Sequence, residues 1–425
     1  MAKIYTNFEF VGKLNIPRDE VFHKVIDNGK GWQGHVVKFV VNETPNNGVF
    51  VELMGGYKPK DKYPIKTSPK LKYDSEGNKI EQSTLEIPFD SRLDDNVVRM
   101  VADFRKIVVD TTTDFEAKNE AAKVRYDIRN IEQKQEITEE ESNQLEELYK
   151  KHNELVPNRK EFLHDFDAAQ YLVDVLPENK THTYKVTGNV EFSEYNGKIQ
   201  KRFKIQTIEI VSDDEKHQLK MTADLFFKKG AVDDSVQESG KKVLIDTYTL
   251  QYDNKTKKDQ YFPLPLVLNL SKVDFNNERQ MKLVELLKKQ LTVTSNKEVY
   301  HLLYELKVVR GAEEVEFDES KLTDQQREFI ELGVSKLEDY KPKGLVYGEA
   351  VEEIQLVKPL LKEVSGNNFT SGALLSDVDV DDLGYKPLEP VGDIGEEVLT
   401  DDEEDTPKKE VEMNSLDDEL AGLFG

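Results

Sequence analysis

The acidity of this 425-residue chain is concentrated near its C-terminal end. Residues 377–425 contain 18 acidic and 3 basic side chains, a net charge of −15 out of −24 for the whole chain. The same stretch has few bulky apolar residues and several Gly and Pro, so it cannot bury enough apolar surface to offset the entropy lost on ordering. We therefore predict a disordered acidic tail over residues 376–425, preceded by a folded part.

The composition argues against several kinds of site. The chain has no cysteine, which excludes disulfides, a cysteine nucleophile, iron–sulfur clusters and Cys-based zinc sites. None of the seven histidines is spaced as in His-Glu-x-x-His, so we expect no metal and no cofactor. The start lacks a secretory apolar core, and no window approaches 18 consecutive apolar residues. We expect a cytoplasmic protein that does not enter membranes, in the host cytoplasm if it is viral.

Two blocks before the tail carry strand signals. In residues 1–110, with a net charge of +1, the turn Thr44–Gly48 separates two of three apolar runs: Ile4–Leu14, His35–Asn42 and Val49–Met54. Residues 180–300, with a net charge of +4, have similar runs and the turn Tyr195-Asn196-Gly197. The runs of this second block are Thr183–Phe192, Lys198–Val211, Leu219–Phe227, Lys242–Tyr252 and Tyr261–Leu270. We predict one small antiparallel barrel in each block.

The sequence between and after these blocks favours helices. Residues 115–156 have no Gly or Pro, and Thr138 begins a capping box, so an antiparallel helical hairpin is expected within the insertion 111–179. The other expected helices are Lys160–Leu176, Asn277–Leu291, Lys297–Leu306 and Thr323–Leu337. Residues 301–375 should form a helical extension on the second barrel. The predicted fold class is α+β, mainly β: two antiparallel barrels, a helical hairpin insertion, C-terminal helices and a disordered tail.

The most basic and aromatic stretch is Tyr57–Tyr73. It combines six lysines with three tyrosines: Lys58, Lys60, Lys62, Lys66, Lys70, Lys72, Tyr57, Tyr63 and Tyr73. Single-stranded nucleic acid needs cations along its phosphates and flat rings on which bases stack, and each stacked base is worth about 1–3 kcal/mol. We interpret the stretch as a nucleic-acid-binding segment; the alternative is a lysine-rich loop that is only solvated.

A second basic and aromatic set lies in the other block. Its members are Lys201, Arg202, Lys204, Phe227, Lys228, Lys229, Lys257, Lys258 and Tyr261. Arg202 and Lys204 should share one face of a strand, with Phe203 opposite in the core. One of Phe226 and Phe227 is expected in the core as well. In the first block, the single tryptophan, Trp32, either stacks a base or caps one end of a barrel, and Lys38 lies on the strand that follows it.

No pattern supports an enzyme. The acids Asp213, Asp214 and Glu215 lie in a turn between expected strands and should be solvated. A calcium loop starting at Asp377 fails, because its sixth position is Asp382 rather than Gly and its twelfth is Leu388 rather than Glu. The glycines around Trp32 do not make a P-loop, and no nucleophile elbow, Rossmann fingerprint or kinase signature is present. We expect a protein that is not an enzyme.

The whole arrangement resembles single-stranded DNA-binding proteins of the oligonucleotide/oligosaccharide-binding (OB) barrel type. The matching parts are the opening Phe8–Leu14, the stretch Tyr57–Tyr73 and the tail tip Asp417–Gly425. In that family the barrel binds the strand, and the acidic tail recruits replication and repair proteins and competes with DNA for the basic groove. The resemblance implies partner binding by six residues of the tip: Asp417, Asp418, Glu419, Leu420, Leu423 and Phe424.

The tip departs from the bacterial pattern, because it lacks a Pro and ends in Gly. The length and the helical insertion are more similar to bacteriophage-encoded members. The sequence thus predicts a protein that binds single-stranded DNA with little sequence preference during replication, recombination or repair. Two alternatives stay open: a structural or assembly protein, for example of a virus, that makes only protein contacts, and an RNA-binding protein.

Overall fold

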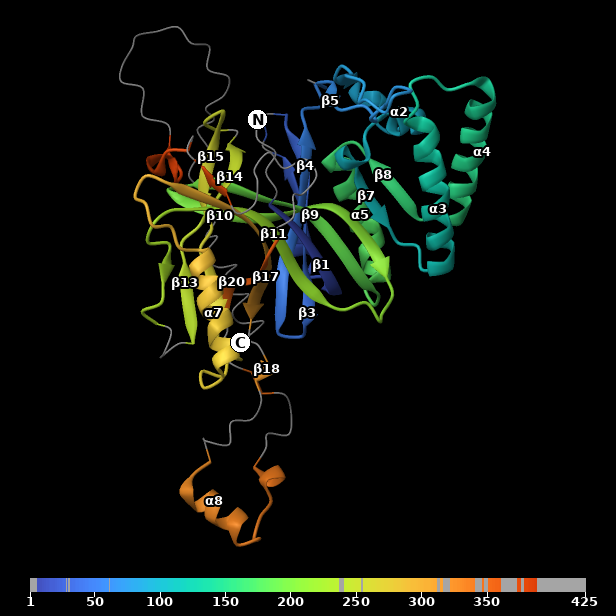
Figure 1. Cartoon of the computed structure of the whole chain (residues 1–425). Coiled ribbons are helices and arrows are strands. Elements are labelled where there is room, and N and C mark those ends of the chain that lie inside the picture. Colours follow the sequence, from blue (N-terminus) through green and yellow to red (C-terminus); the bar gives the residue numbers. More distant parts are fainter. Residues whose placement is uncertain are drawn as a thin grey trace.

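The computed structural model describes residues 6–27, 29, 31–60, 62–236, 241–253, 255–311, 314–315, 322–340, 346–347, 351–360, 373–375 and 378–387. These residues form a mainly β structure, as predicted, with strands running through a central sheet and helices at its margins (Figure 1). None of the helices they form is long and apolar enough to cross a membrane. Most of the predicted tail, including its tip Asp417–Gly425, lies outside the described residues. Its first part does not: within residues 378–387, Leu383 packs in a core cluster with Phe226, and Tyr385 stacks on Phe262, so the prediction of disorder was wrong for this part.

The elements before residue 182 are, in chain order, β1 (Thr6–Asn15), α1 (Asp19–Phe22), β2 (His23–Asp27), β3 (Gln33–Thr44), β4 (Asn47–Tyr57), β5 (Ile65–Thr67), β6 (Leu85–Ile87), α2 (Asp95–Met100), β7 (Ile107–Asp110), α3 (Phe115–Glu132), α4 (Glu139–Leu155), β8 (Arg159–Phe162) and α5 (Asp165–Asn179). The later strands are β9 (Thr183–Tyr195), β10 (Lys198–Val211), β11 (Gln218–Phe227), β12 (Val232–Asp233), β13 (Lys242–Ile245), β14 (Tyr248–Asp253), β15 (Lys258–Pro263), β16 (Leu266–Asn269), β17 (Val299–Gly311), β18 (Glu314–Val315), β19 (Val346–Tyr347), β20 (Val351–Pro359) and β21 (Ala373–Leu375). Two further helices are α7 (Glu278–Gln290) and α8 (Asp324–Glu331).

Five strands from both predicted blocks close into a ring. β1 pairs with β9 along one edge and, through Lys13–Asn15, with β3 on the other. β3 and β4 form a hairpin, β9 and β10 form another, and β4 meets β10 in parallel at Glu52 and Lys204. β1 can turn toward β3 because residue 12 is glycine: a Cβ there would lie 2.0 Å from the carbonyl oxygen of Asn42. The ring order is therefore β1–β3–β4–β10–β9, back to β1.

Most of the remaining strands extend from this ring, whereas β5 with β6 and β18 with β19 form two separate two-stranded sheets. β11 pairs with β1 on one edge and with β17 on the other, and β20, β16 and β13 follow in succession. One continuous apolar core includes Phe10 from β1, Phe203 from β10, Leu225 from β11 and Leu306 from β17. Two barrels contained within residues 1–110 and 180–300 are thus not confirmed, since the two blocks share one sheet and one core.

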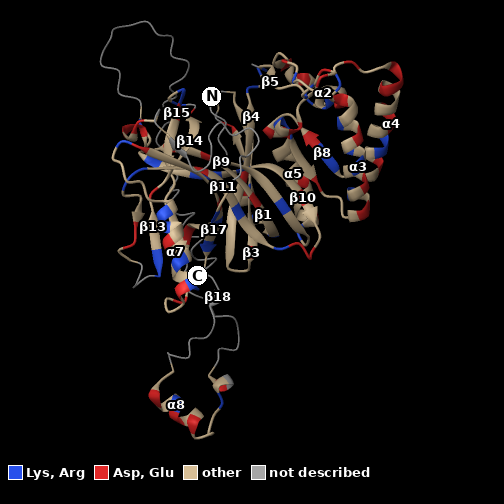
Figure 2. Ribbon diagram, in the orientation of Figure 1, with Lys and Arg blue, Asp and Glu red and all other residues tan. Residues whose placement is uncertain are grey.

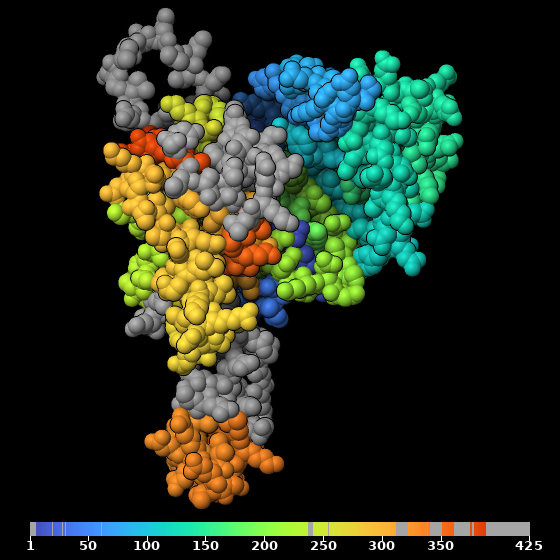
Figure 3. Space-filling model, viewed as in Figure 1, coloured from blue at the N-terminus to red at the C-terminus, as the bar shows by residue number. Residues whose placement is uncertain are grey.

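The segment between β4 and β9 contains the predicted helical hairpin. α3 and α4 pack together, and Thr138 forms the expected capping box with Glu141 at the start of α4. The hairpin and residues 58–100 form one lobe beside the sheet (Figure 3). α5 follows and packs on β3 and β4. β7 and β8, on either side of the hairpin, join it to the sheet because β7 pairs in parallel with β10 just beyond β4.

Several predictions of secondary structure were wrong. Lys242–Tyr252 is divided between β13 and β14, and Tyr261–Leu270 between β15 and β16. Lys297–Leu306 is not a helix; most of it belongs to β17, a central strand buried on both faces. The sequence of such a strand does not alternate between apolar and polar residues, so it cannot be told from a buried helix by its periodicity. The same error affects the extension 301–375, which contributes β17 and β20 to the sheet instead of forming a purely helical layer. Lys160–Phe162 belongs to strand β8, so the helix begins only at Asp165; it also continues through Pro177.

The shared ring makes a prediction about truncation. Residues 1–110 alone should remain unfolded, because β9 and β10 would be missing and rings such as Phe8 and Phe10, which pack on Phe203, would face water. A fragment of residues 1–387, which keeps every described element, should melt cooperatively. Amide dispersion in a two-dimensional NMR spectrum and thermal melting by circular dichroism distinguish the two fragments. A well-dispersed, cooperatively melting 1–110 fragment would show that the first block is an independent barrel after all.

Candidate nucleic-acid interface

Trp32 lies across the outer face of the β3–β4 hairpin. Gly34 and Gly56 are paired in the hairpin, and a Cβ on either one would lie 2.2–2.3 Å from carbons of the Trp32 indole. The ring therefore rests on the backbone of two neighbouring strands, a position that any larger residue at 34 or 56 would block. The tryptophan is half-buried, and its seat fits a stacking surface rather than a plug inside the ring of strands.

Cations follow Trp32 along this face. In the register of the hairpin, Val36 pairs with Met54 and Lys38 with Glu52, so all four share the outer face with the indole. Glu52 holds two cations: its carboxylate is 2.9 Å from Lys38 Nζ and 3.7 Å from Arg202 Nε. Lys38 and Arg202 keep 46% and 43% of their side-chain surface exposed.

Lys204 lies beside this pair and is held differently. Its Nζ is 2.9 Å from Asp165, at the start of α5, and 3.6 Å from Glu191 on β9. Burial by itself lowers the pKa of Lys204, but the two carboxylates outweigh it and raise the pKa, so the side chain stays charged. We call the surface formed by Trp32, Lys38, Glu52, Met54, Arg202 and Lys204 the Trp32 face.

Two histidines support the hairpin that carries Trp32. His23 on β2 and His35 on β3 stack with a centroid separation of 5.0 Å, and His23 Nε2 lies 2.7 Å from His35 Nδ1. The edge of His35 also meets the ring of Phe166 at 4.8 Å. His164 caps α5, since its Nδ1 accepts a hydrogen bond from the backbone N–H of Phe166. These contacts fix the β2–β3 hairpin against the first turn of α5.

The predicted segment Tyr57–Tyr73 is divided by the structure. Its first part leaves β4 next to Trp32, because Tyr57 pairs with Gln33. Lys58, Lys60, Lys62 and Lys66 are exposed there, and Tyr63 is 74% exposed. Lys62 and Lys66 each pair with a carboxylate, of Asp90 and Glu86 respectively. This part is positioned to extend the Trp32 face.

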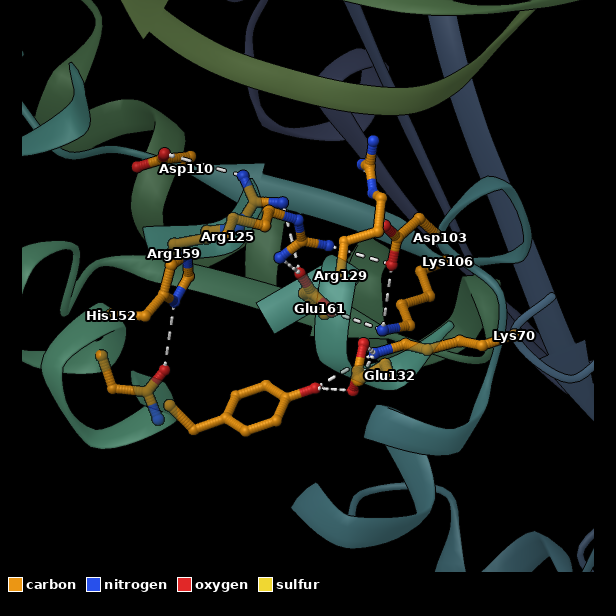
Figure 4. A network of polar contacts seen from close by, with 12 residues as sticks. Lys70, Asp103, Lys106, Asp110, Arg125, Arg129, Glu132, His152, Arg159 and Glu161 are labelled. Carbon is orange, nitrogen blue, oxygen red and sulfur yellow. Dashed lines mark hydrogen bonds and ion pairs between the residues drawn. The ribbon is translucent and has the colours of Figure 1, made fainter. Parts of the chain in front are cut away.

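The other members of the segment do not present a binding surface. Tyr57 packs between Phe89 and Phe166, with centroid separations of 4.7 and 4.9 Å. Lys70 turns toward the helical hairpin, where its Nζ lies 2.5 Å from Glu132 and 3.0 Å from the hydroxyl of Tyr149 (Figure 4). Lys72 and Tyr73 are half-buried, and the backbone N–H of Tyr73 donates to the carbonyl of Gln133. For these four residues the expected open patch is wrong, because they anchor the insertion.

The second predicted set is also divided. Arg202 and Lys204 join the Trp32 face, whereas Lys201 points the other way and lies over the ring of Phe203, in the core as expected. Phe227 was wrongly predicted to stack bases: it is fully buried, as is Phe226. Tyr261 is half-buried against Phe226. Lys228 and Lys229 follow the end of β11, a strand that does not pair with β3 or β4.

Lys257, in the turn between β14 and β15, and Lys258, the first residue of β15, are both exposed. An ion pair of 2.6 Å between Lys255 and Glu194 ties this turn to the β9–β10 turn at Tyr195-Asn196-Gly197. Asn196 and Gly197 have φ values of 50° and 76°, as a tight hairpin turn requires and as the Asn-Gly pair predicts. The two lysines thus lie near the start of β10, the strand that carries Arg202 and Lys204 a few residues further on.

Sequence reasoning missed the two glycines under Trp32 and the role of Glu52. The signal was present, because the turn between β3 and β4 sets the register that pairs residue 34 with residue 56. The described residues contain no group of three His, Asp or Glu side chains that could hold a metal ion. No protein-family model matches this chain, and no curated protein matches it either.

The histidine contacts predict a loss of stability in mild acid. Burial lowers the pKa of His35, and His23 lowers it further; burial also lowers the pKa of His164, against the opposing charges of Asp165 and Asp167. Folding therefore favours the neutral imidazoles. Their contribution to the free energy of unfolding is complete above pH about 6.5 and is lost as the pH falls below that value. The melting temperature should drop between pH 7.5 and 5.5.

The variant His164→Asn tests the cause, because asparagine caps helices without titrating. Its melting temperature should fall less over the same pH range. His182→Gln, beyond the other end of α5, serves as the matched control and should behave like the parent chain. An equal pH dependence in the parent chain and in His164→Asn would contradict the assignment to this helix cap.

Proposed function

We propose that this protein binds single-stranded DNA on the Trp32 face, without strong sequence preference, during replication, recombination or repair. The observation that carries the proposal is the Trp32 indole seated on two paired glycines, on the same face of the hairpin as Lys38, which shares Glu52 with Arg202. A ring on a sheet surface offers stacking to any base, and fixed cations beside it can follow the phosphates. Protection of the bound strand follows from covering its bases and backbone.

The strand order of the ring supports the same proposal. In chain order its strands are β1, β3, β4, β9 and β10, and the third meets the fifth in parallel. This agrees with a five-stranded Greek-key barrel of the OB type, in which the second and third strands and the loops after the first and fourth bind oligonucleotides. Here the second and third strands bear the Trp32 face, Trp32 ends the loop after the first, and Lys257 and Lys258 lie near the loop after the fourth.

Substitution of Trp32 tests the proposal most directly. Trp32→Ala should weaken binding to oligo-dT by about 1–3 kcal/mol, the value of one stacked base, while Trp32→Phe should retain much of the affinity. Fluorescence anisotropy of a labelled oligo-dT, beside a duplex of equal length, measures the effect. Tyr126→Ala, which removes an exposed ring from α3, is the matched control and should change nothing. Equal affinities for Trp32→Ala and the parent chain would remove Trp32 from the interface.

Because Trp32 is the sole tryptophan, intrinsic fluorescence reports on this site alone. Oligo-dT should quench it. The substitution Arg202→Gln should lower the slope of log affinity against log salt by about 0.7, the value for one phosphate contact on a single strand. Lys216→Gln, an exposed lysine in the turn after β10, is its control. Quenching without any change of slope in Arg202→Gln would leave stacking in place but exclude Arg202 as a phosphate contact.

The proposal includes the acidic tail as a site for replication and repair partners and as a competitor for the basic surface. Residues 388–425 carry a net charge of −12 and, as a tethered segment, act at high effective concentration on nearby cations. Deletion of residues 388–425 keeps every described residue and should tighten oligo-dT binding at low salt but not at high salt. Unchanged affinity at low salt would remove the competition from the proposal.

The alternative, a structural or assembly protein that makes only protein contacts, is favoured by one observation. Phe329 on α8 is more than a third exposed, and Leu332 and Val334 just beyond it are largely exposed. Absence of oligo-dT binding by both the full chain and the chain without residues 388–425, at low salt, would favour this alternative.

A further inference from the structure

A cleft with a volume of about 690 Å³ lies between the helical hairpin and residues 93–106. Seven basic residues line it but only four acidic ones, so the cleft carries an excess of positive charge. In contrast, acidic side chains gather on α4, which begins with three consecutive glutamates (Figure 2). An anion that approaches the insertion is therefore drawn to the cleft rather than to the outer surface of α4.

The charges in the cleft form two tiers (Figure 4). In the inner tier, Glu161 lies 2.8 Å from Lys106 and 2.9 Å from Arg125. Burial alone would raise the pKa of Glu161, but Arg125, Lys106 and Arg159 outweigh it and hold the pKa far below its ordinary value. These ion pairs attach the hairpin to β7 and β8. Their burial marks them as structural, since removal of one partner would leave an uncompensated charge.

The outer tier faces solvent. Asp103 is 42% exposed, and three cations converge on it: Arg125 at 3.0 Å, Lys106 at 3.6 Å and Arg129 at 3.7 Å. Arg129 is itself 55% exposed. The three cations that hold this half-exposed carboxylate are already positioned as hydrogen-bond donors. Another singly charged anion, such as a phosphodiester, can bind to the same donors.

The exposed ring of Phe104 lies beside this place, with the Arg105 guanidinium 5.3 Å from its centroid, and connects it with the Trp32 face. Phe104 is 59% exposed, and its backbone carbonyl accepts a hydrogen bond of 2.5 Å from Gln206 Nε2. Gln206 follows Arg202 and Lys204 at alternate positions of β10. The outer side of β10 therefore leads from the Trp32 face to the rim of the cleft, with no other element between Gln206 and Phe104.

We propose that the single strand continues from the Trp32 face along β10 into the hairpin cleft. There Arg125 and Arg129 bind a phosphate in competition with Asp103, and a base stacks on Phe104. This inference rests on the proposed function and assigns the insertion a direct role in DNA binding. The helical hairpin thus lengthens the binding site and is not only a structural addition to the ring of strands.

The test compares oligo-dT of about 6 and about 20 nucleotides. The shorter length is near the lower limit of the site sizes of one OB-type domain, and the longer one exceeds their upper limit. The short strand should occupy the Trp32 face alone, and the long one should reach the cleft. For the long strand, Phe104→Ala should weaken binding about fivefold or more, and Arg129→Gln should lower the salt slope by about 0.7. Asp103→Asn should act in the opposite direction and raise both affinity and slope. None of the three should alter binding of the short strand.

Lys123→Gln is the matched control, because it removes an exposed cation from the same helix outside the cleft and should have no effect. Melting curves of each variant check that the hairpin remains folded. If Trp32→Ala weakens both strands while the cleft variants bind the long strand like the parent chain, the cleft is excluded and the proposed function stands. If oligo-dT of either length fails to bind, or Trp32→Ala has no effect, the proposed function fails, and this inference fails with it.

Discussion

The meeting of β4 and β10 at Glu52 and Lys204 is the contact on which the rest of the structure depends. It closes the ring between strands that lie about 150 positions apart in the sequence, and it places the cations of β10 beside the hairpin that carries Trp32. The same edge of β10 then receives β7, which anchors the helical hairpin. One strand thus holds the ring, the Trp32 face and the insertion in a fixed relation, and any shift in its register would move all three.

Carboxylates order the cations on both candidate surfaces. Glu52 holds Lys38 and Arg202, and Asp103 holds Arg125 and Arg129, in each case leaving the cations partly exposed. Long basic side chains lose considerable rotamer freedom when they bind, so cations that are already fixed bind a phosphate at a lower entropic cost. The carboxylates also reduce the net positive charge of the unbound surfaces, which lowers the repulsion among their cations.

The sequence was a good guide to local structure and a poor one to contacts between distant segments. The β3–β4 hairpin, the Asn196-Gly197 turn and the capping box at Thr138 follow from short patterns, and the structure contains all three. The closure of one ring from two blocks left no such pattern, because pairing between distant strands adds nothing to the local sequence. Lys70 illustrates the same limit: its lysine-rich surroundings indicated a binding loop, whereas its partner, Glu132, lies 62 positions away.

The arrangement also determines how stacking and charge share the work of binding. A phosphate that binds at Arg202 or Arg129 displaces or shares an existing ion pair, so its electrostatic gain is smaller than at a free cation. In the proposed interface, a base that stacks on Phe104 would likewise replace an existing contact, because the Arg105 guanidinium lies 5.3 Å from the centroid of that ring. Stacking and charge would therefore act together in the proposed interface. Because every base has a π-face, binding of this kind would have little sequence preference, and the ordered cations would set the path of the strand rather than its sequence.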